Sequence, residues 1–262
     1  INPYKILISL FILLANKYYY LTKAKGDLSI VGGLCRKKLN TKKVINAHSL
    51  DYDIYLKIKD KEIKTQNSYA VFLDEDMANH PDYINENVKP PIDEDEYYST
   101  LINFLKKFEA KTNLKIKFAL HPRAKYSEET LSKLKGIDYL SGSTAELVKN
   151  SKIVLLHCST SLSYAILFKK PTVFLTSKKL KSSWIGPRID NFAKTLNDKP
   201  IYIEEDFEKH LKLDNLFHID EKKYQDYIDQ YLKVPNSPNE PFWEIVTDFI
   251  KKNDLKKIMN NA

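Results

Sequence analysis

Three groups of polar residues each follow a short apolar segment of this sequence, and their types are suited to chemistry on a charged substrate. The groups are Asp74-Glu75-Asp76, His121-Pro122-Arg123 and His157-Cys158-Ser159-Thr160-Ser161. A carboxylate can accept a proton from a hydroxyl nucleophile. Histidine, arginine and hydroxyl groups can bind the phosphate of a departing nucleotide, and histidine can also protonate it. Together the groups indicate transfer chemistry on a phosphate-activated substrate.

The segments before these groups have the character of buried β-strands. Residues 69–73 and 153–156 are continuous apolar runs, as expected of parallel strands that are covered on both faces, and residues 116–120 are mostly apolar. Between the predicted strands at residues 69–73 and 116–120, residues 96–111 have apolar side chains at the spacing of one helix face. Strands that alternate with helices predict an α/β fold with a doubly wound parallel sheet. Since such sheets bind ligands at the carboxyl ends of their strands, we expect the three groups to meet in one cleft.

Hydroxyl residues stand at the predicted starts of two helices. Residues 159–161 precede a short apolar-periodic segment at 162–168. Free backbone N–H groups and the helix dipole favour an anion at such a position, although the same hydroxyls are also suited to capping the helix. Ser143 and Glu146 fit a capping box at the start of another predicted helix.

The chain divides into three predicted parts. Residues 1–64 are too few for a usual α/β domain and are predicted to form a small or truncated N-terminal domain. Residues 65–235 are predicted to form a Rossmann-like domain, and residues 236–262, which begin with a segment containing two prolines, a linker and a C-terminal helix. The apolar run from Ile6 to Ala15 is too short to cross a bilayer and lacks a signal-peptide cleavage site, so we expect a buried element there.

Composition narrows the choice of partners. The formal net charge of +8 attracts acidic partners, among them phosphorylated small molecules and anionic lipid surfaces. The sequence has no arginine-rich tract, zinc-ligand spacing or recognisable nucleic-acid module, so nucleic acid is not an expected partner. Cys35 and Cys158 lie far apart and form neither a metal-ligand pattern nor a disulfide framework, which fits a reducing cytoplasm.

The order and type of the three groups resemble the bacterial sialyltransferases and polysialyltransferases, and the related capsule and lipopolysaccharide transferases that use CMP-activated sugars. Those families have an acidic pair, a His-Pro motif and a Ser/Thr pair on a GT-B fold of two Rossmann-like domains. The resemblance implies a GT-B-like α/β fold, with residues 1–64 on the acceptor side and the C-terminal helix packing back across the domains. It also implies inverting, metal-independent transfer of sialic acid, Kdo or a similar sugar to a glycan or glycolipid acceptor, in the cytoplasm or at the inner face of the membrane with peripheral association.

The same resemblance implies roles for individual residues. An acidic residue among Asp74, Glu75 and Asp76 is the expected base, and His121 is expected to assist the leaving CMP phosphate. No metal or other cofactor is expected. Two departures from the family pattern concern the choice of these residues: Asp76 replaces the glycine that often follows the acidic pair, and His80-Pro81 is a second His-Pro motif. The residues expected to bind the donor are Arg123, Ser141, Gly142, Ser143, Thr144, His157, Ser159, Thr160 and Ser161.

Other functions fit the same residues. Asp74 and Asp76 have the spacing of a metal-binding DxD motif, in which two carboxylates hold a divalent cation on a diphosphate. A polyol-phosphate transferase or a UDP-sugar-dependent GT-B enzyme such as an epimerase would use the same anion site. A non-catalytic module that binds anionic glycans or nucleic acid would show the steep salt dependence of multiple phosphate contacts.

Overall fold

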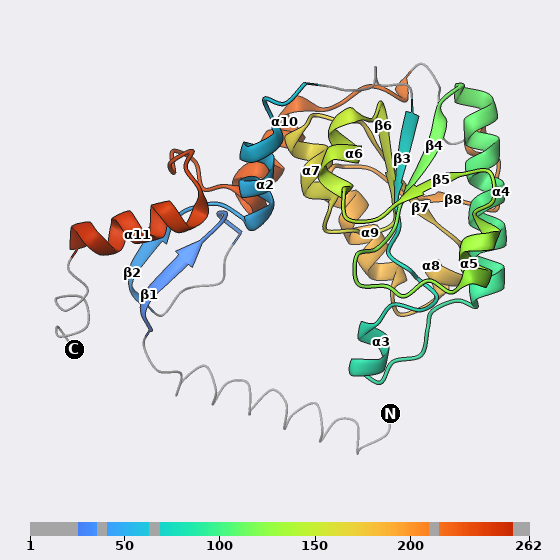
Figure 1. The fold of residues 1–262 in the computed structure, drawn as a ribbon, viewed down its shortest axis with the longest axis horizontal. Helices are drawn as coiled ribbons and strands as arrows, with labels where there is room; N and C mark the ends of the chain where they lie inside the picture. Colours follow the sequence, from blue (N-terminus) through green and yellow to red (C-terminus); the bar gives the residue numbers. More distant parts are fainter. Residues whose placement is uncertain (1–25, 36–40, 63–68, 210–214, 254–262) are drawn as a thin grey trace.

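The computed structural model describes residues 26–35, 41–62, 69–209 and 215–253. The apolar run at residues 6–15 lies outside the described residues. The larger of the two sheets in the described residues has six strands in the order β5-β4-β3-β6-β7-β8, and all of its pairs are parallel (Figure 1). Its strands are β3 Tyr69–Leu73, β4 Lys115–Ala119, β5 Asp138–Leu140, β6 Ile153–Leu156, β7 Thr172–Thr176 and β8 Ile201–Tyr202.

This strand order is that of a doubly wound sheet. The chain runs outward from β3 through β4 to β5, then crosses back to the other side of β3 and continues outward through β6, β7 and β8. The direction of winding therefore reverses between β3 and β6, and ligands bind at this switch point in open α/β sheets. The topology confirms the predicted α/β class, a GT-B-like fold with a Rossmann-type parallel sheet.

Alternate strand residues point to opposite faces of the sheet, and both faces are covered. Phe72, Phe118 and Leu155 belong to a core with α4, whereas Val71, Val154 and Leu156 belong to a second core with α6, α7 and α10. Figure 1 shows α4 on one side of the sheet and α6, α7 and α10 on the other. Burial on both faces explains the continuous apolar runs in the sequence. The helices named here and α5 have the bounds α4 Glu94–Thr112, α5 Glu128–Lys133, α6 Thr144–Asn150, α7 Leu162–Leu167 and α10 Glu221–Tyr227. The helix α10 continues as a π-helical segment, Ile228–Leu232.

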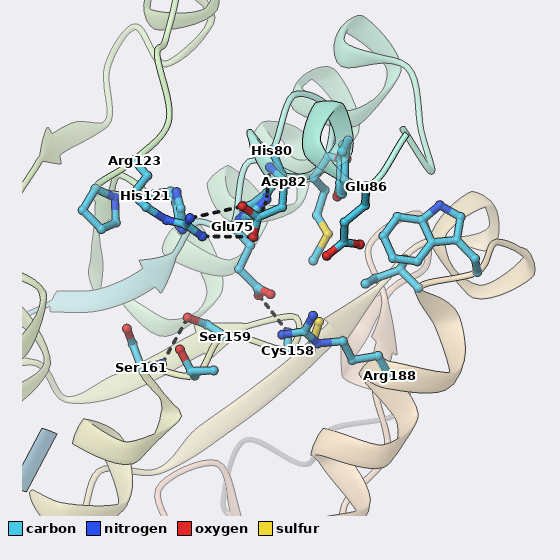
Figure 2. Close-up of a pocket in the computed structure, with 16 residues that line it drawn as sticks. Glu75, His80, Asp82, Glu86, His121, Arg123, Cys158, Ser159, Ser161 and Arg188 are labelled. Carbon is cyan, nitrogen blue, oxygen red and sulfur yellow. Dashed lines mark hydrogen bonds and ion pairs between the residues drawn. The ribbon is translucent and has the colours of Figure 1, made fainter. Parts of the chain in front are cut away.

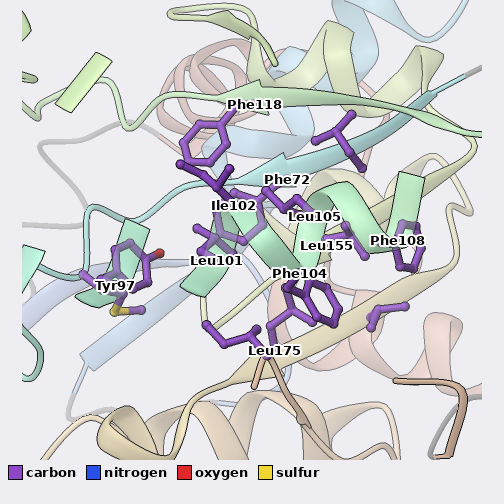
Figure 3. Packing of buried hydrophobic residues seen from close by; sticks show 14 of the residues in the cluster. Phe72, Tyr97, Leu101, Ile102, Phe104, Leu105, Phe108, Phe118, Leu155 and Leu175 are labelled. Carbon is purple, nitrogen blue, oxygen red and sulfur yellow. The ribbon is translucent and has the colours of Figure 1, made fainter. Parts of the chain in front are cut away.

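The helix α4 is the largest element on its face of the sheet. Asp93 caps it, because its side chain accepts the backbone N–H groups of Asp95 and Glu96, and Asn113 ends it in a left-handed conformation with φ 56°. Its apolar face consists of buried residues that pack against Phe72 and Phe118 (Figure 3). These contacts hold β3 and β4 firmly beneath the site described below.

Four described helices lie in segments for which the sequence predicted none: α2 Leu50–Ile58, α3 Asp82–Asn85, α8 Lys178–Ser182 and α9 Gly186–Thr195. Both Gly186 and Pro187 are compatible with the start of α9, since proline is tolerated in the first turn of a helix. Gly186 is also needed for close packing: a Cβ atom there would lie 2.3 Å from the backbone oxygen of Lys181. The turn between α8 and α9 is therefore compact, and it faces the carboxyl ends of the strands.

A smaller cluster lies apart from the main sheet. The strands β1 Gly26–Val31 and β2 Thr41–Asn46 form a parallel pair, and Ile45 and Ala47 pack against Ile245 and Val246 of α11 Phe242–Asn253. His48 joins this cluster to the segment before α11, since its Nε2 lies 2.8 Å from the backbone oxygen of Glu240. The boundaries at residues 64 and 235 stay a prediction. Across the described ranges, no helix combines the length and apolar character needed to cross a membrane.

Candidate active site at the switch point of the sheet

A cavity of about 310 Å³ opens at the carboxyl ends of β3, β4 and β6, and we call it the switch-point cavity (Figure 2). All three polar groups from the sequence contribute to its lining, as expected from their positions after neighbouring parallel strands. The predicted site residues that line it are Glu75, His121, Arg123, Ser159, Thr160 and Ser161. Residues brought to it from other segments include Met77, His80, Asp82, Tyr83, Glu86, Trp184, Ile185 and Arg188.

Glu75 bridges the ends of two neighbouring strands. Its Oε1 atom accepts the backbone N–H of Cys158 at 2.8 Å and that of His157 at 3.2 Å, so the carboxyl group is fixed between β3 and β6. Burial raises the pKa of Glu75 to about 7, although the hydrogen bond from Cys158 and the nearby charge of Arg188 oppose the shift. A carboxyl group with this pKa can both take up and release a proton near neutral pH.

The two flanking acids point away from the cavity. Asp76 has φ 47°, a left-handed conformation at the position where the resembled family often has glycine. This turn directs Glu75 to the cavity, while the Asp76 carboxylate accepts the Tyr98 hydroxyl at 3.3 Å. Asp74 accepts the Tyr126 hydroxyl at 2.6 Å and is almost fully buried, which raises its pKa. Of the three acids, only Glu75 lines the cavity, and the DxD interpretation does not fit because its two carboxylates are bound by tyrosines.

Two histidines from different loops stand side by side in the cavity. The ring centroids of His80 and His121 are 4.8 Å apart. Nδ1 of His80 accepts the backbone N–H of Asp82, so its neutral ring carries the proton on Nε2, whereas Nδ1 of His121 is buried and has no partner among the described residues. Burial lowers the pKa of both rings, and the nearby charges of His80 and Arg123 lower that of His121 further. Both imidazoles are therefore neutral at pH 7 and can gain a proton when an anion arrives.

Two arginines supply the fixed positive charge. Arg123 forms a two-pronged ion pair with Asp82, with both N–O distances at 3.1 Å. Arg188, in α9, pairs with no carboxylate among the described residues. Figure 2 shows the two guanidinium groups on different sides of Glu75. Arginine binds phosphate with two parallel hydrogen bonds, so this arrangement can hold an anion with more than one phosphate.

The three hydroxyl residues at 159–161 do not cap α7 with their side chains. Ser161 occupies the N-cap position without a capping hydrogen bond from its side chain, and Ser159 Oγ accepts the N–H of Ser161 at 3.3 Å. The backbone N–H groups of Ser159 and Thr160 have no acceptor among the described residues. Since α7 has only 6 residues, its dipole contributes little, and these N–H and O–H donors are what the loop offers an anion.

Five predicted donor-binding residues lie outside the cavity. His157 is fully buried: Nδ1 donates to the Leu175 carbonyl at 2.8 Å, and Nε2 lies 3.1 Å from the Tyr97 hydroxyl. Burial lowers the pKa of His157 to about 4, so the ring is neutral and direct contact with a nucleotide does not fit its position. The others follow β5 and do not line the cavity; they are Ser141, Gly142, Ser143 and Thr144.

The predicted capping box at the start of α6 is wrong. Ser143 stands at the N-cap position, but its side chain makes no capping hydrogen bond. Glu146 instead forms an ion pair with Lys61 at 3.1 Å. The preceding Gly142 has φ 78°, so the chain enters the helix from a turn that does not bring the hydroxyl over the free N–H groups.

Comparison with known proteins gives matches among solved structures only. No protein-family model matches the chain, and no curated protein does. The structure of S. aureus MnaA with UDP is 14% identical, with a TM-score of 0.45, over 81% of this chain and 55% of that one. The Methanocaldococcus jannaschii UDP-GlcNAc 2-epimerase in complex with UDP-GlcNAc and UDP is 12% identical, with a TM-score of 0.41, over 79% of this chain and 55% of that one. The chain thus spans about half the length of these structures.

These matches correct the resemblance inferred from the sequence. The similar solved structures include UDP-GlcNAc 2-epimerases and the UDP-bound MnaA, so the predicted likeness to CMP-sugar sialyltransferases is wrong. The order of acidic, His-Pro and Ser/Thr groups follows from the positions of strand ends in a parallel sheet, which many nucleotide-binding proteins share.

Some of the cavity residues that were not predicted have weak signals in the sequence. The whole chain has three arginines, Arg36, Arg123 and Arg188, among 42 basic residues, and two of them line this cavity. A lysine-rich protein that uses arginine in so few places indicates sites where the planar guanidinium is needed. His80 carried a signal in its His-Pro pair, but Trp184 and Glu86 stood in segments without periodicity.

Proposed function

We propose that this chain binds a nucleoside-diphosphate sugar in the switch-point cavity and acts on it as a UDP-sugar-dependent enzyme of the epimerase kind. The observation that carries the proposal is the position of Glu75, a carboxyl group with a pKa of about 7, in one cavity with Arg123 and Arg188. The arginines are suited to the diphosphate, and the carboxyl group is suited to moving a proton.

The anion-binding groups fit a diphosphate better than a single phosphate. Arg188 can bind one phosphate with a pair of hydrogen bonds, and Arg123, from a different element, can bind another with the N–H groups that its pair with Asp82 leaves free. Ser159 and Thr160 add free backbone donors at the end of β6. A bound diphosphate would also raise the pKa of His80 and His121, because a nearby negative charge favours the imidazolium form. Protonated His121 would then neutralise charge that develops on the phosphate.

Inversion of a sugar carbon that carries hydrogen requires one group to take its proton and another to return a proton to the opposite face. As a carboxylate, Glu75 can take the proton and become neutral, and it returns to the carboxylate when it releases that proton to solvent or to a neighbouring group. The proton added at the opposite face of the carbon comes from solvent or from a protonated group on that side. Its two hydrogen bonds from β6 hold the reacting oxygen in place, which limits the reorganisation needed during the reaction.

Binding and turnover test the proposal in two steps. Titration calorimetry is expected to show UDP binding more tightly than UMP by about tenfold or more, because the second phosphate gains its own charged hydrogen bonds. UDP-GlcNAc, the ligand named for the M. jannaschii structure, is then incubated with the protein in D₂O and followed by proton NMR. Deuterium is expected to enter the sugar at the inverted carbon.

The matched variant is Glu75→Gln, which keeps the acceptor for the Cys158 N–H but cannot take a proton. It is expected to bind UDP within about twofold of the wild type and to lose deuterium incorporation by a factor of about 100 or more. Equal affinity for UMP and UDP would overturn the diphosphate site, and undiminished exchange in Glu75→Gln would overturn the role of Glu75.

A further inference from the structure

We infer that Trp184 is a specificity-determining residue whose indole packs against the sugar ring of the bound nucleotide sugar, an inference that rests on the function proposed above. Trp184 lines the switch-point cavity from the turn between α8 and α9, and 46% of its surface is exposed. A large aromatic side chain that lines a polar cavity and is left half open offers apolar area to a ligand.

The indole is held in place without a ligand. Its Nε1–H donates to the Lys89 carbonyl at 3.1 Å, and its ring stands at 90° to that of Tyr83 with the centroids 5.5 Å apart. Tyr83 is fixed in turn, since its hydroxyl donates to the Met77 carbonyl at 3.3 Å. The loop after β3 therefore sets the position of the ring, and a ligand that packs on it loses little affinity to ordering the side chain.

The residues around Trp184 favour a sugar over a nucleobase. Tyr83 and Ile185 make this part of the cavity apolar, while Glu86 offers a carboxylate, which Figure 2 shows turned toward the cavity. A carboxylate accepts hydrogen bonds and donates none when ionised, so it matches the several hydroxyl donors of a sugar. The uracil ring offers a single N–H donor flanked by two carbonyl oxygens that a carboxylate repels. An aromatic face beside an acceptor is thus suited to the C–H face and hydroxyl edge of a pyranose.

The phosphate groups fix which end of the ligand reaches Trp184. Arg123 and residues 159–161 lie at the ends of β4 and β6, whereas Trp184 follows β7 and lies beside Arg188 in sequence. A diphosphate held between the two arginines therefore presents one of its substituents to the aromatic side. The Glu86 carboxylate and the aromatic rings line that side of the cavity, so the substituent presented there is the sugar.

The chain has two tryptophans, Trp184 and Trp243, which allows a direct test. Trp243, in α11, does not line the cavity, so Trp243→Phe leaves Trp184 as the single indole reporter. Titration of Trp243→Phe with UDP-GlcNAc is expected to change the fluorescence of Trp184, while UDP, which lacks the sugar, is expected to change it by less than half as much.

Affinities of a second variant complete the test. Trp184→Ala is expected to weaken UDP-GlcNAc binding by about tenfold and UDP binding by less than about twofold, while Trp184→Phe keeps most of the affinity. If UDP binds normally but Trp184→Ala weakens UDP and UDP-GlcNAc equally, or weakens neither, the inference is overturned and the proposed function stands. If UDP does not bind Trp243→Phe at all, the inference about Trp184 and the proposed function are both overturned.

Discussion

The carboxylate of Glu75 accepts the backbone N–H of Cys158 at 2.8 Å, and this bond joins the ends of β3 and β6 where the winding of the sheet reverses. The acid follows β3, the first strand of the main sheet, and the loop at residues 157–161 follows β6, its neighbour across the switch point. This hydrogen bond thus fixes the distance between the carboxyl group that we propose moves a proton and the donors that we propose hold a phosphate. The predictions below test this arrangement and its surroundings.

The raised pKa of Glu75 predicts that its charge destabilises the fold at high pH. With a pKa of about 7 in the folded protein and an ordinary value of 4.5, the folded state binds more protons than the unfolded state between these values. The free energy of unfolding therefore falls as the pH rises through this window and stays lower above it. Glu75→Gln cannot ionise, so its stability relative to wild type is expected to rise by roughly 1–3 kcal/mol from pH 4.5 to pH 8.

Urea denaturation of both proteins at the two pH values measures this effect. The buried Asp74 and Asp76 shift stability in the same direction, but they are present in both proteins and largely cancel in the difference. If the difference in the free energy of unfolding between Glu75→Gln and wild type stays constant with pH, Glu75 ionises with an ordinary pKa.

Asp76 provides a test of the turn that aims Glu75 at the cavity. At φ 47°, alanine meets the steric cost of the left-handed conformation, while glycine does not. Both Asp76→Ala and Asp76→Gly lose the hydrogen bond from Tyr98, so Asp76→Ala is expected to be less stable than Asp76→Gly by about 1 kcal/mol. Thermal or urea unfolding of the pair gives the comparison, and equal stabilities would argue against this conformation.

Arg188 is expected to be the arginine on which binding depends most, because it forms no ion pair among the described residues, whereas Arg123 is paired with Asp82. Arg188→Ala is expected to weaken UDP affinity by about tenfold or more, and Arg188→Lys by less, since lysine keeps the charge but not the paired hydrogen bonds. The control is Lys179→Ala, which removes an exposed charge that is paired with Glu96. Calorimetry should show less than about a twofold change in the control; similar losses in both would mean that net charge alone attracts UDP.

Tyr97 and His157 form a structural contact beneath the cavity. Tyr97→Phe leaves the buried Nε2 of His157 without its partner, so a loss of stability of about 1–2 kcal/mol is expected, with UDP affinity unchanged. Tyr139→Phe, which removes an exposed hydroxyl on β5, is the matched control and is expected to change stability by less than about 0.5 kcal/mol. If Tyr97→Phe folds but no longer binds UDP, His157 contributes to the UDP-binding site.

The main sheet and the meeting of the three polar groups could be predicted from the sequence for a simple reason. Strands that are covered on both faces appear in the sequence as continuous apolar runs. Parallel strands place the residues that follow them at one edge of the sheet. Which acid faces the cavity could not be predicted, because that depends on the left-handed backbone of Asp76, an uncommon conformation for aspartate.

Other parts of the site depend on contacts between distant segments. Trp184 reaches the cavity because its indole binds the carbonyl of Lys89, 95 residues away in the sequence. Arg188 is placed by α9, whose first residues, glycine and proline, suggested an irregular segment. The choice of a CMP donor rested on the order of motifs alone, and this order is a property of the strand ends rather than of the nucleotide.

The most direct test of the central claim is a crystal structure of the protein soaked with UDP. The account predicts that the diphosphate lies between Arg123 and Arg188, with an oxygen within hydrogen-bond distance of the backbone N–H of Ser159 or Thr160 and with the Glu75 carboxyl group beside it. A diphosphate bound elsewhere on the molecule, with the switch-point cavity holding only solvent, would contradict it.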